Sequence, residues 1–141
     1  MPEIPAGLRY TSDHVWVRRV ADGRVRIGVT DFAQQSLGNV AEVTPPRAGD
    51  AIEAGAACGD IRSVESVSDL IAPVTGTTRV SNGNLAGQPD LVNFDPYGDG
   101  WIFEADVAPG LLDEQFATLL DSCVYRVLTG SLFSCGQLCL L

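Results

Sequence analysis

Apolar and polar residues alternate over several short stretches of the chain, and this period of two predicts β-strands. The alternation is clean in 24–29 and also runs through 15–20, and Asp22-Gly23 between these stretches is a strong hairpin-turn signal. Further short runs bounded by turn residues predict strands at 40–44, 51–54, 56–64, 67–72, 77–80 and 101–107. The chain is therefore expected to be mainly β.

The apolar spacing becomes helical at three places. A two-turn helix is predicted to end at Gly38, and either Thr30 or Asp31 can cap its first turn. Residues 85–94 indicate one loose helical turn. From 111 to 128 the spacing predicts a helix that is followed by a second turn or helix. Many short strands with a few helices favour a small β barrel or sandwich with helical decorations.

The length of 141 residues fits one domain, which we expect at 9–129. Residues 1–8 contain two prolines and are predicted to form an N-terminal arm. Residues 130–141 form an uncharged, largely apolar tail, for which packing on the core, self-association and disorder all stay open. No stretch reaches the roughly 20 apolar residues that a membrane-spanning helix needs.

One predicted hairpin stands out because its middle is small and polar while its arms contain apolar residues. The arms are 56–64 and 67–72, and Pro73 and Gly76 then end the motif. A hairpin of this kind presents the side chain at its tip to solvent. The side chain at the predicted tip is Glu65.

Charge and composition exclude several functions. The net charge is −9, which disfavours binding to the phosphate backbone of a nucleic acid and leaves basic protein surfaces, or solubility alone, as the explanation. Lys and Arg together number 9, and all of them are arginines. The chain therefore has no lysine, and its N-terminal amine is the one amine available for an amide or a Schiff base.

Candidate catalytic and metal-binding residues are few. None of the four cysteines belongs to a CxxC pair and the one histidine lies far from them in sequence, so a metal site is not indicated. Asp13 and His14 are neighbours, but sequence neighbours rarely orient each other as a catalytic pair. No signal peptide, phosphate-binding loop or nucleophile elbow is visible. We expect a soluble cytoplasmic protein that is not an enzyme.

Four collinear stretches resemble the glycine cleavage system H protein family. They are Tyr10-Thr11-x-Asp13-His14-x-Trp16, Gly28 to Gly38, Ser63 to Gly76, and Asn82 to Trp101. The resemblance implies a lipoyl-domain-like barrel-sandwich hybrid with two small antiparallel sheets, short helices and a C-terminal helix. It also implies a role in glycine catabolism. Members carry lipoate in amide linkage on a lysine at the hairpin tip. That arm passes an aminomethyl group from glycine decarboxylase (P protein) to aminomethyltransferase (T protein) and is reoxidised by dihydrolipoamide dehydrogenase (L protein).

The sequence departs from the family at the attachment position. The family pattern is similar to Glu-Ser-Val-Lys-x-Val-Ser-Asp, where this chain has Glu65 at the lysine position and Arg62 at the acidic position. The other hairpin residues that we assign to the site are Ser63, Val64, Ser66, Val67, Ser68 and Asp69. A carboxylate cannot form the amide, so we expect no lipoate on this chain.

Three hypotheses follow from this substitution. In the first, the chain is a lipoate-free module that still docks on the P, T and L proteins. In the second, it is a diverged paralogue or inactive gene product. In the third, it is a working carrier with substitutions at the tip. By resemblance, Ser12, Asp13, His14 and Asp69 face a cleft near the hairpin or contact partners; alternatively, Asp13 caps a turn and His14 lies on the surface. Four further residues are expected to fix a loop: Asn93, Asp95, Tyr97 and Trp101.

Overall fold

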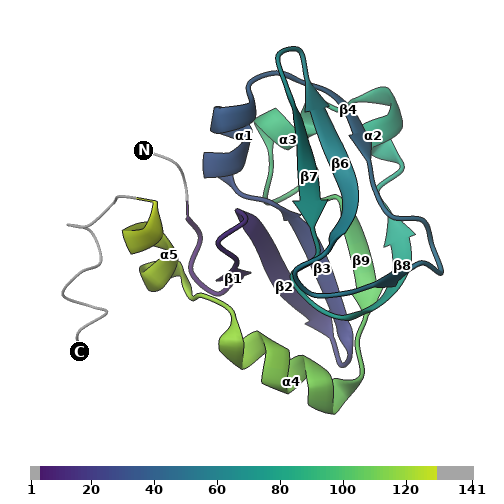
Figure 1. Ribbon diagram of the computed structural model, residues 1–141, viewed down its shortest axis with the longest axis vertical. Coiled ribbons are helices and arrows are strands. Elements are labelled where there is room, and N and C mark those ends of the chain that lie inside the picture. The colour runs from purple at the N-terminus through teal and green to yellow at the C-terminus, as the bar shows by residue number, and fades with distance from the viewer. Residues whose placement is uncertain (1–3, 130–141) are drawn as a thin grey trace.

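The computed structural model describes residues 4–129, which form two antiparallel sheets around a shared core (Figure 1). The order in the six-stranded sheet is β1 (Arg9–Tyr10), β2 (Val15–Ala21), β3 (Arg24–Val29), β9 (Phe103–Asp106), β8 (Gly76–Ser81) and β5 (Ala51–Ile52). The order in the three-stranded sheet is β4 (Val40–Thr44), β6 (Ala57–Ser63) and β7 (Val67–Ile71). The prediction of a mainly β fold with two antiparallel sheets is confirmed. The predicted tail at 130–141 lies outside the described residues.

Five helices lie within the described part of the chain: α1 (Asp31–Leu37), α2 (Asn84–Gly87), α3 (Leu91–Phe94), α4 (Pro109–Thr118) and α5 (Ser122–Leu128). Thr30 is the N-cap of α1, because its side chain accepts a hydrogen bond from the backbone N–H of Ala33 at 3.2 Å. Thr30 and not Asp31 is therefore the capping residue.

Three predicted boundaries are wrong for identifiable reasons. The single loose turn at 85–94 is two separate turns, α2 and α3, because Pro89 has no N–H with which to continue a helix. The strand predicted at 51–54 ends at Ile52, where a turn begins in which the N–H of Ala56 donates to the carbonyl of Glu53. Helix α4 ends at Thr118, and the following residues pair with β1 instead.

The main hydrophobic core lies between the two sheets. It contains alternate residues of β2 and β3, including Val15, Val17, Val25 and Ile27. Trp16 points to the opposite face of β2 and is nevertheless fully buried, in a second cluster that also contains Ile4, Leu8, Tyr10, Tyr97 and Tyr125. The N-terminal arm and α5 thus complete the fold by covering the second face of β2.

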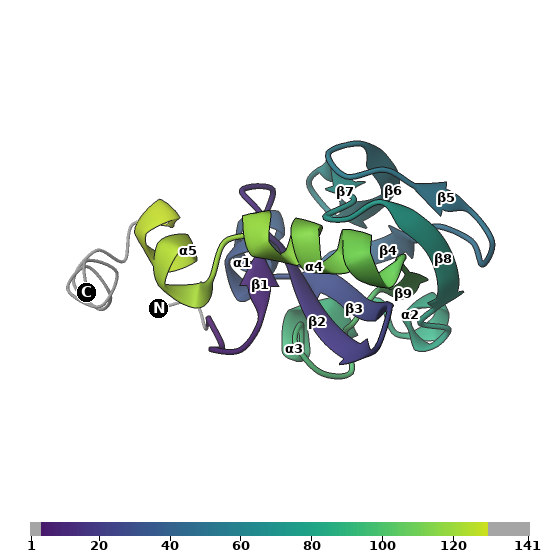
Figure 2. The same ribbon diagram turned by 90° about the horizontal axis from the view of Figure 1, so that it is seen from below.

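The two C-terminal helices pack on different parts of the fold (Figure 2): α4 contributes Leu112 to the main core, whereas α5 contributes Tyr125 to the second cluster. In α4, the guanidinium groups of Arg9 and Arg19 both lie over the ring of Phe116, and Arg19 also forms an ion pair with Asp113. In α5, the ring of Tyr125 stacks on that of Tyr10 with their centroids 4.7 Å apart. This stacking places the hydroxyl group of Tyr125 next to the β1–β2 turn.

Candidate functional site

The tip of the β6–β7 hairpin is a tight turn that is closed by its own serines. The N–H of Ser63 donates to the carbonyl of Ser66 at 2.8 Å, and the hydroxyl of Ser63 accepts from the backbone N–H groups of Ser66 at 3.0 Å and Glu65 at 3.3 Å. Val64 and Glu65 therefore form the apex, and both side chains are exposed. The side chain of Glu65 makes none of the bonds that close the turn.

The other hairpin residues predicted for the site divide between a buried and an exposed face. Ser63 is buried, whereas Arg62 and Val67 are exposed and pair across the two strands. Asp69 pairs with Asp60 in the same ladder. The hairpin thus offers a mixed surface of carboxylates, one guanidinium group and exposed valines.

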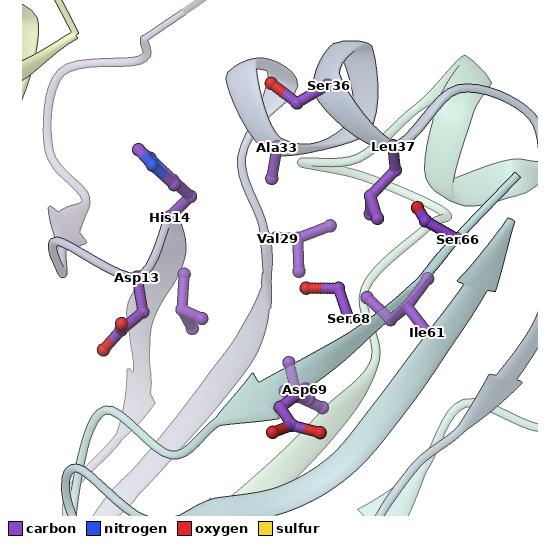
Figure 3. Close-up of a pocket in the computed structure, with 12 residues that line it drawn as sticks. Asp13, His14, Val29, Ala33, Ser36, Leu37, Ile61, Ser66, Ser68 and Asp69 are labelled. Atoms are coloured by element: carbon purple, nitrogen blue, oxygen red, sulfur yellow. The ribbon is translucent and has the colours of Figure 1, made fainter.

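A cleft of about 260 Å³ separates the hairpin from the β1–β2 turn and α1 (Figure 3). Asp13 and His14 lie on one side of it, and Ser68 and Asp69 lie on the other. The remaining lining residues are Val15, Val29, Ala33, Ser36, Leu37, Ile61, Ser66 and Leu70. The cleft has an apolar floor and a polar, acidic rim, so it can accommodate a short alkyl chain that ends in a cationic or neutral polar group.

The β1–β2 turn places Asp13 and His14 at this cleft. Thr11 closes the turn, because its hydroxyl accepts from the N–H groups of Asp13 at 3.2 Å and Val15 at 3.3 Å. Asp13 therefore does not cap the turn. His14 adopts a left-handed backbone conformation with φ of 65°, which is uncommon for a residue with a side chain. Ser12 is exposed and is not among the residues that line the cleft.

His14 is held by residues distant in sequence. Its Nδ1 lies 2.7 Å from the hydroxyl oxygen of Tyr125, which in turn lies 2.7 Å from Oγ1 of Thr30. The ring also packs against Phe32 with the centroids 4.6 Å apart. Burial lowers the pKa of His14 from its usual value, and the carboxylate of Asp13 partly offsets this by raising the pKa. The geometry holds His14 through a tyrosine of α5 rather than through a pair with Asp13.

Tyr125 and Thr30 are positioning residues that the sequence analysis did not assign to the site. Burial raises the pKa of the Tyr125 phenol to about 12, so the group stays protonated and can donate one hydrogen bond. Helical spacing placed Tyr125 in a predicted helix. No local pattern, however, indicates that this helix docks beside the β1–β2 turn.

The loop between α3 and β9 fixes one side of the site region. Asn93 accepts from the N–H of Val40 at 2.8 Å and donates to the carbonyl of Gly38 at 2.8 Å. The carboxylate of Asp95 accepts from the N–H of Asp99, and the hydroxyl of Tyr97 accepts from the N–H of Asp31. Asp95 thus holds its own loop as predicted, whereas Asn93, which lies in α3, and Tyr97 join this part of the chain to α1 and β4.

Other classes of site find no support in the described residues. Between residues 4 and 129, no group of three or more histidine, cysteine, aspartate or glutamate side chains is arranged to hold a metal ion. In the same part of the chain, no helix is both long and apolar enough to cross a membrane.

The structure is a mainly β module with an exposed hairpin above an acidic-rimmed cleft, and comparisons with known proteins identify its family. The family model described as "Glycine cleavage H-protein" matches residues 8–126. A glycine cleavage system H protein of Mycolicibacterium smegmatis is 51% identical over 126 residues, which span 89% of this chain and 96% of that protein. A protein of the same description from Mycobacterium leprae is 48% identical over 127 residues.

A solved structure agrees with these sequence relatives. The crystal structure of a glycine cleavage system H protein from Mycobacterium marinum superposes with a TM-score of 0.80 at 34% identity, covering 90% of this chain and 99% of that one. The chain therefore belongs to the glycine cleavage H-protein family. Members of this family are lipoate-bearing carrier proteins of the glycine cleavage system and are not enzymes, and their partners are the P, T and L proteins.

Proposed function

We propose that this chain is an H protein without lipoate, which docks on proteins of the glycine cleavage system but carries no aminomethyl group between them. One observation carries the proposal: the exposed apex of the β6–β7 hairpin holds Glu65, and the sequence contains no lysine. The family's lipoyl group requires an amine, and a carboxylate does not supply one. The residues present therefore do not fit the covalent attachment of lipoate.

No other side chain on the hairpin supplies an amine for the family's amide linkage, and its one thiol is poorly placed. Cys58 lies in β6, where it is partly buried and its thiol donates to the carbonyl of Leu70 at 3.4 Å. Burial raises the pKa of this thiol to about 11, so it stays protonated and weakly nucleophilic. It also lies away from the tip. These observations support a hairpin that has the shape of a carrier pedestal but lacks the group to which the arm would be attached.

The docking half of the proposal rests on the ordered backbone at the hairpin end of the molecule. The turn that presents Glu65 is closed by Ser63 and Ser66, and the cleft beneath it has an apolar floor and an acidic rim. A partner that recognises the shape of this end would meet the same backbone whether the tip is a lysine or a glutamate. Such a chain would compete with lipoylated H protein for its partners.

Ligase recognition can be tested by gain of function. The variant Glu65→Lys and the matched control Glu53→Lys, which alters an exposed carboxylate in another turn, are each coexpressed with a lipoate–protein ligase and lipoate. Intact-mass measurement should show the lipoyl increment on Glu65→Lys alone. Modification of both variants would show that the hairpin is not specifically presented. An unmodified Glu65→Lys chain would mean that ligase recognition is lost.

Docking is tested separately by calorimetric titration of the unaltered chain with purified P, T and L proteins of the same system. We expect saturable binding to at least one of them, and competition with its lipoylated H protein. Absence of binding to all three would contradict the docking half and favour a diverged paralogue with another role.

A further inference from the structure

Helix α5 lies at one end of the molecule and turns an apolar side to solvent (Figure 1 and Figure 2). Its Tyr125 is fully buried, whereas Val124 is 43% exposed, Val127 38% and Leu128 50%. Residues three and four positions apart lie on the same side of a helix, so these three exposed side chains adjoin one another. One side of α5 is therefore left uncovered by residues 4–129.

Cys123 borders this apolar side, because it lies four residues before Val127 in the same helix. It is partly buried and is disulfide-bonded in the structure. Cys58, the other cysteine in the part of the chain that the structure describes, is free. The sulfur that pairs with Cys123 therefore belongs to a cysteine outside that part, where the sequence has Cys135 and Cys139.

The chain that follows α5 matches this apolar side in composition. Residues 130–141 contain no charged side chain, and their large apolar residues are Leu132, Phe133, Leu138, Leu140 and Leu141. The one charged residue of α5, Arg126, donates to the carbonyl of Ile4 at 3.3 Å. A segment of the tail that lies on α5 would thus bury apolar surface on both elements without burying a charge.

The spacing along the chain favours Cys135 over Cys139 as the partner. Cys123 lies six residues before Thr129, the C-cap of α5, which corresponds to about 9 Å along the helix axis. Gly130 comes next, and glycine at this position commonly lets the chain turn back. An extended segment advances about 3.3 Å per residue, so three returning residues cover the same length and bring Cys135 beside Cys123. Cys139 would then lie about 13 Å further along the segment.

We propose that Cys123 and Cys135 form a reversible disulfide that holds residues 131–134 on the apolar side of α5, with Leu132 and Phe133 as the covering side chains. Of the three possibilities that the sequence left open for the tail, this one is packing on the fold. The site is a redox modification site that is independent of the hairpin and of lipoate.

The bond forms by thiol–disulfide exchange with a low-molecular-weight disulfide. The two protein thiols lose two protons and two electrons as their S–S bond forms, while the S–S bond of the reagent breaks and leaves two thiols. Glutathione keeps most cytoplasmic thiols reduced, so in that compartment the bond would open and close with the redox state. Opening releases the segment and exposes Val124, Val127 and Leu128.

The test equilibrates the full chain with mixtures of reduced and oxidised glutathione, blocks the remaining thiols by alkylation, and digests the chain with trypsin without reduction. Trypsin cuts after Arg126 and so separates Cys123, in peptide 80–126, from Cys135, in peptide 127–141. Mass spectrometry should find the two peptides joined. The fraction joined at each glutathione ratio gives the equilibrium constant for linkage.

Cysteine variants identify the partner of Cys123. Cys135→Ser should lower the equilibrium constant for linkage at least about tenfold, because Cys139 is less well placed, whereas the matched control Cys139→Ser should stay within about twofold of the unaltered chain. Equal linkage in Cys135→Ser and in the unaltered chain would overturn the assigned pair.

Leucine and phenylalanine variants test whether the segment lies on α5. The double substitution Leu132→Ser with Phe133→Ser should lower the equilibrium constant about tenfold, and the control Leu140→Ser with Leu141→Ser should leave it within about twofold. In the unaltered chain, oxidation should also slow backbone hydrogen exchange in α5. If the first double variant links as readily as the unaltered chain, the segment does not pack on α5. Circular dichroism verifies that each variant is folded.

Two further outcomes would overturn the inference as a whole. One is the absence of linkage at every glutathione ratio, and the other is a covalent dimer in which Cys123 pairs with a cysteine of a second copy of the chain. None of these measurements uses lipoate or the P, T and L proteins, so their result is distinguishable from the success or failure of the proposed function.

Discussion

The hairpin tip and the surroundings of Trp16 differ in how strongly the fold constrains them. At the tip, the side chains of Val64 and Glu65 extend into solvent and the turn is closed without them. Trp16, by contrast, is fully buried, and its indole N–H donates to the carbonyl of Pro96 at 2.9 Å. A methyl group on Gly28 would lie 2.7 Å from the indole ring.

This difference explains how a chain can keep the family's fold whichever side chain stands at its hairpin tip. A substitution beside Trp16 displaces a large buried side chain, so it is costly for any protein with this fold. A substitution of an exposed tip residue typically changes stability by less than about 0.5 kcal/mol. The attachment position that we propose at the tip therefore lies where the fold exerts little selection, and similarity to the family does not settle which residue occupies it.

The largest expected effect is the loss of stability caused by Gly28→Ala, a substitution beside the buried Trp16. The new methyl group must displace the indole of Trp16 and disturb its bond to Pro96, and overpacking of this kind costs about 1–3 kcal/mol. Urea denaturation should show a loss in this range. The matched control Gly83→Ala, where a methyl group meets open space, should change stability by less than about 1 kcal/mol. Equal losses for both variants would contradict the packing account.

A smaller loss is expected from Tyr125→Phe, which keeps the stacking on Tyr10 but removes the hydroxyl between His14 and Thr30. Loss of the hydroxyl should lower the free energy of unfolding by about 1–3 kcal/mol, because polar groups of the cluster lose a buried partner. The substitution should increase the rate of backbone hydrogen exchange in α5 more than in the β6–β7 hairpin. Unchanged exchange in α5 would mean that the hydroxyl does not hold this helix.

The pH dependence of His14 is expected to be weaker still, because Asp13 opposes the effect of burial on its pKa. The pKa is lowered in the folded state, so folding favours the neutral ring. The contribution of His14 to the free energy of unfolding is fully present above the pKa of the unfolded chain, about 6.5, and is lost as the pH falls through the pKa of the folded state. As the chain has one histidine, NMR gives a single ring titration. A folded pKa above that of the unfolded chain would contradict this assignment.

The variant His14→Asn isolates the contribution of that ring. Asparagine tolerates the left-handed backbone conformation of this position and has no titratable side chain. The difference in unfolding free energy between the two proteins should shrink as the pH falls through the folded pKa of His14. A difference that does not change with pH would leave the ring without a role in this dependence.

The smallest effect is expected at the tip itself, where Glu65→Ala should change the free energy of unfolding by less than about 0.5 kcal/mol. The reason is that its side chain makes none of the bonds that close the turn. Urea denaturation beside the control Glu53→Ala measures this directly. A loss above about 1 kcal/mol would show that the tip is constrained by the fold after all.

The sequence was most informative where structure is local. The β2–β3 and β6–β7 hairpins follow from alternation and turn residues, and α1 follows from its cap and Gly38. Side chains of the two serines that close the tip belong to the same four-residue turn. These features depend on neighbours within a few residues, so pattern alone predicts them.

Non-local contacts were not predictable in the same way. Tyr125 reaches His14 from 111 positions away, and Trp16 is buried on the polar side of its strand by the arm and by the loop that contains Pro96. Alternation along the strand cannot reveal that a second cluster covers the face on which Trp16 lies. The cleft likewise combines three separate segments, and the resemblance to the family rather than any spacing rule indicated its position.

The most direct test of the central claim is the intact mass of the unaltered chain after coexpression with a lipoate–protein ligase and lipoate, followed by peptide mapping. The account predicts the unmodified mass, and in particular an unmodified peptide that contains Glu65. A lipoyl increment mapped to the hairpin would contradict it.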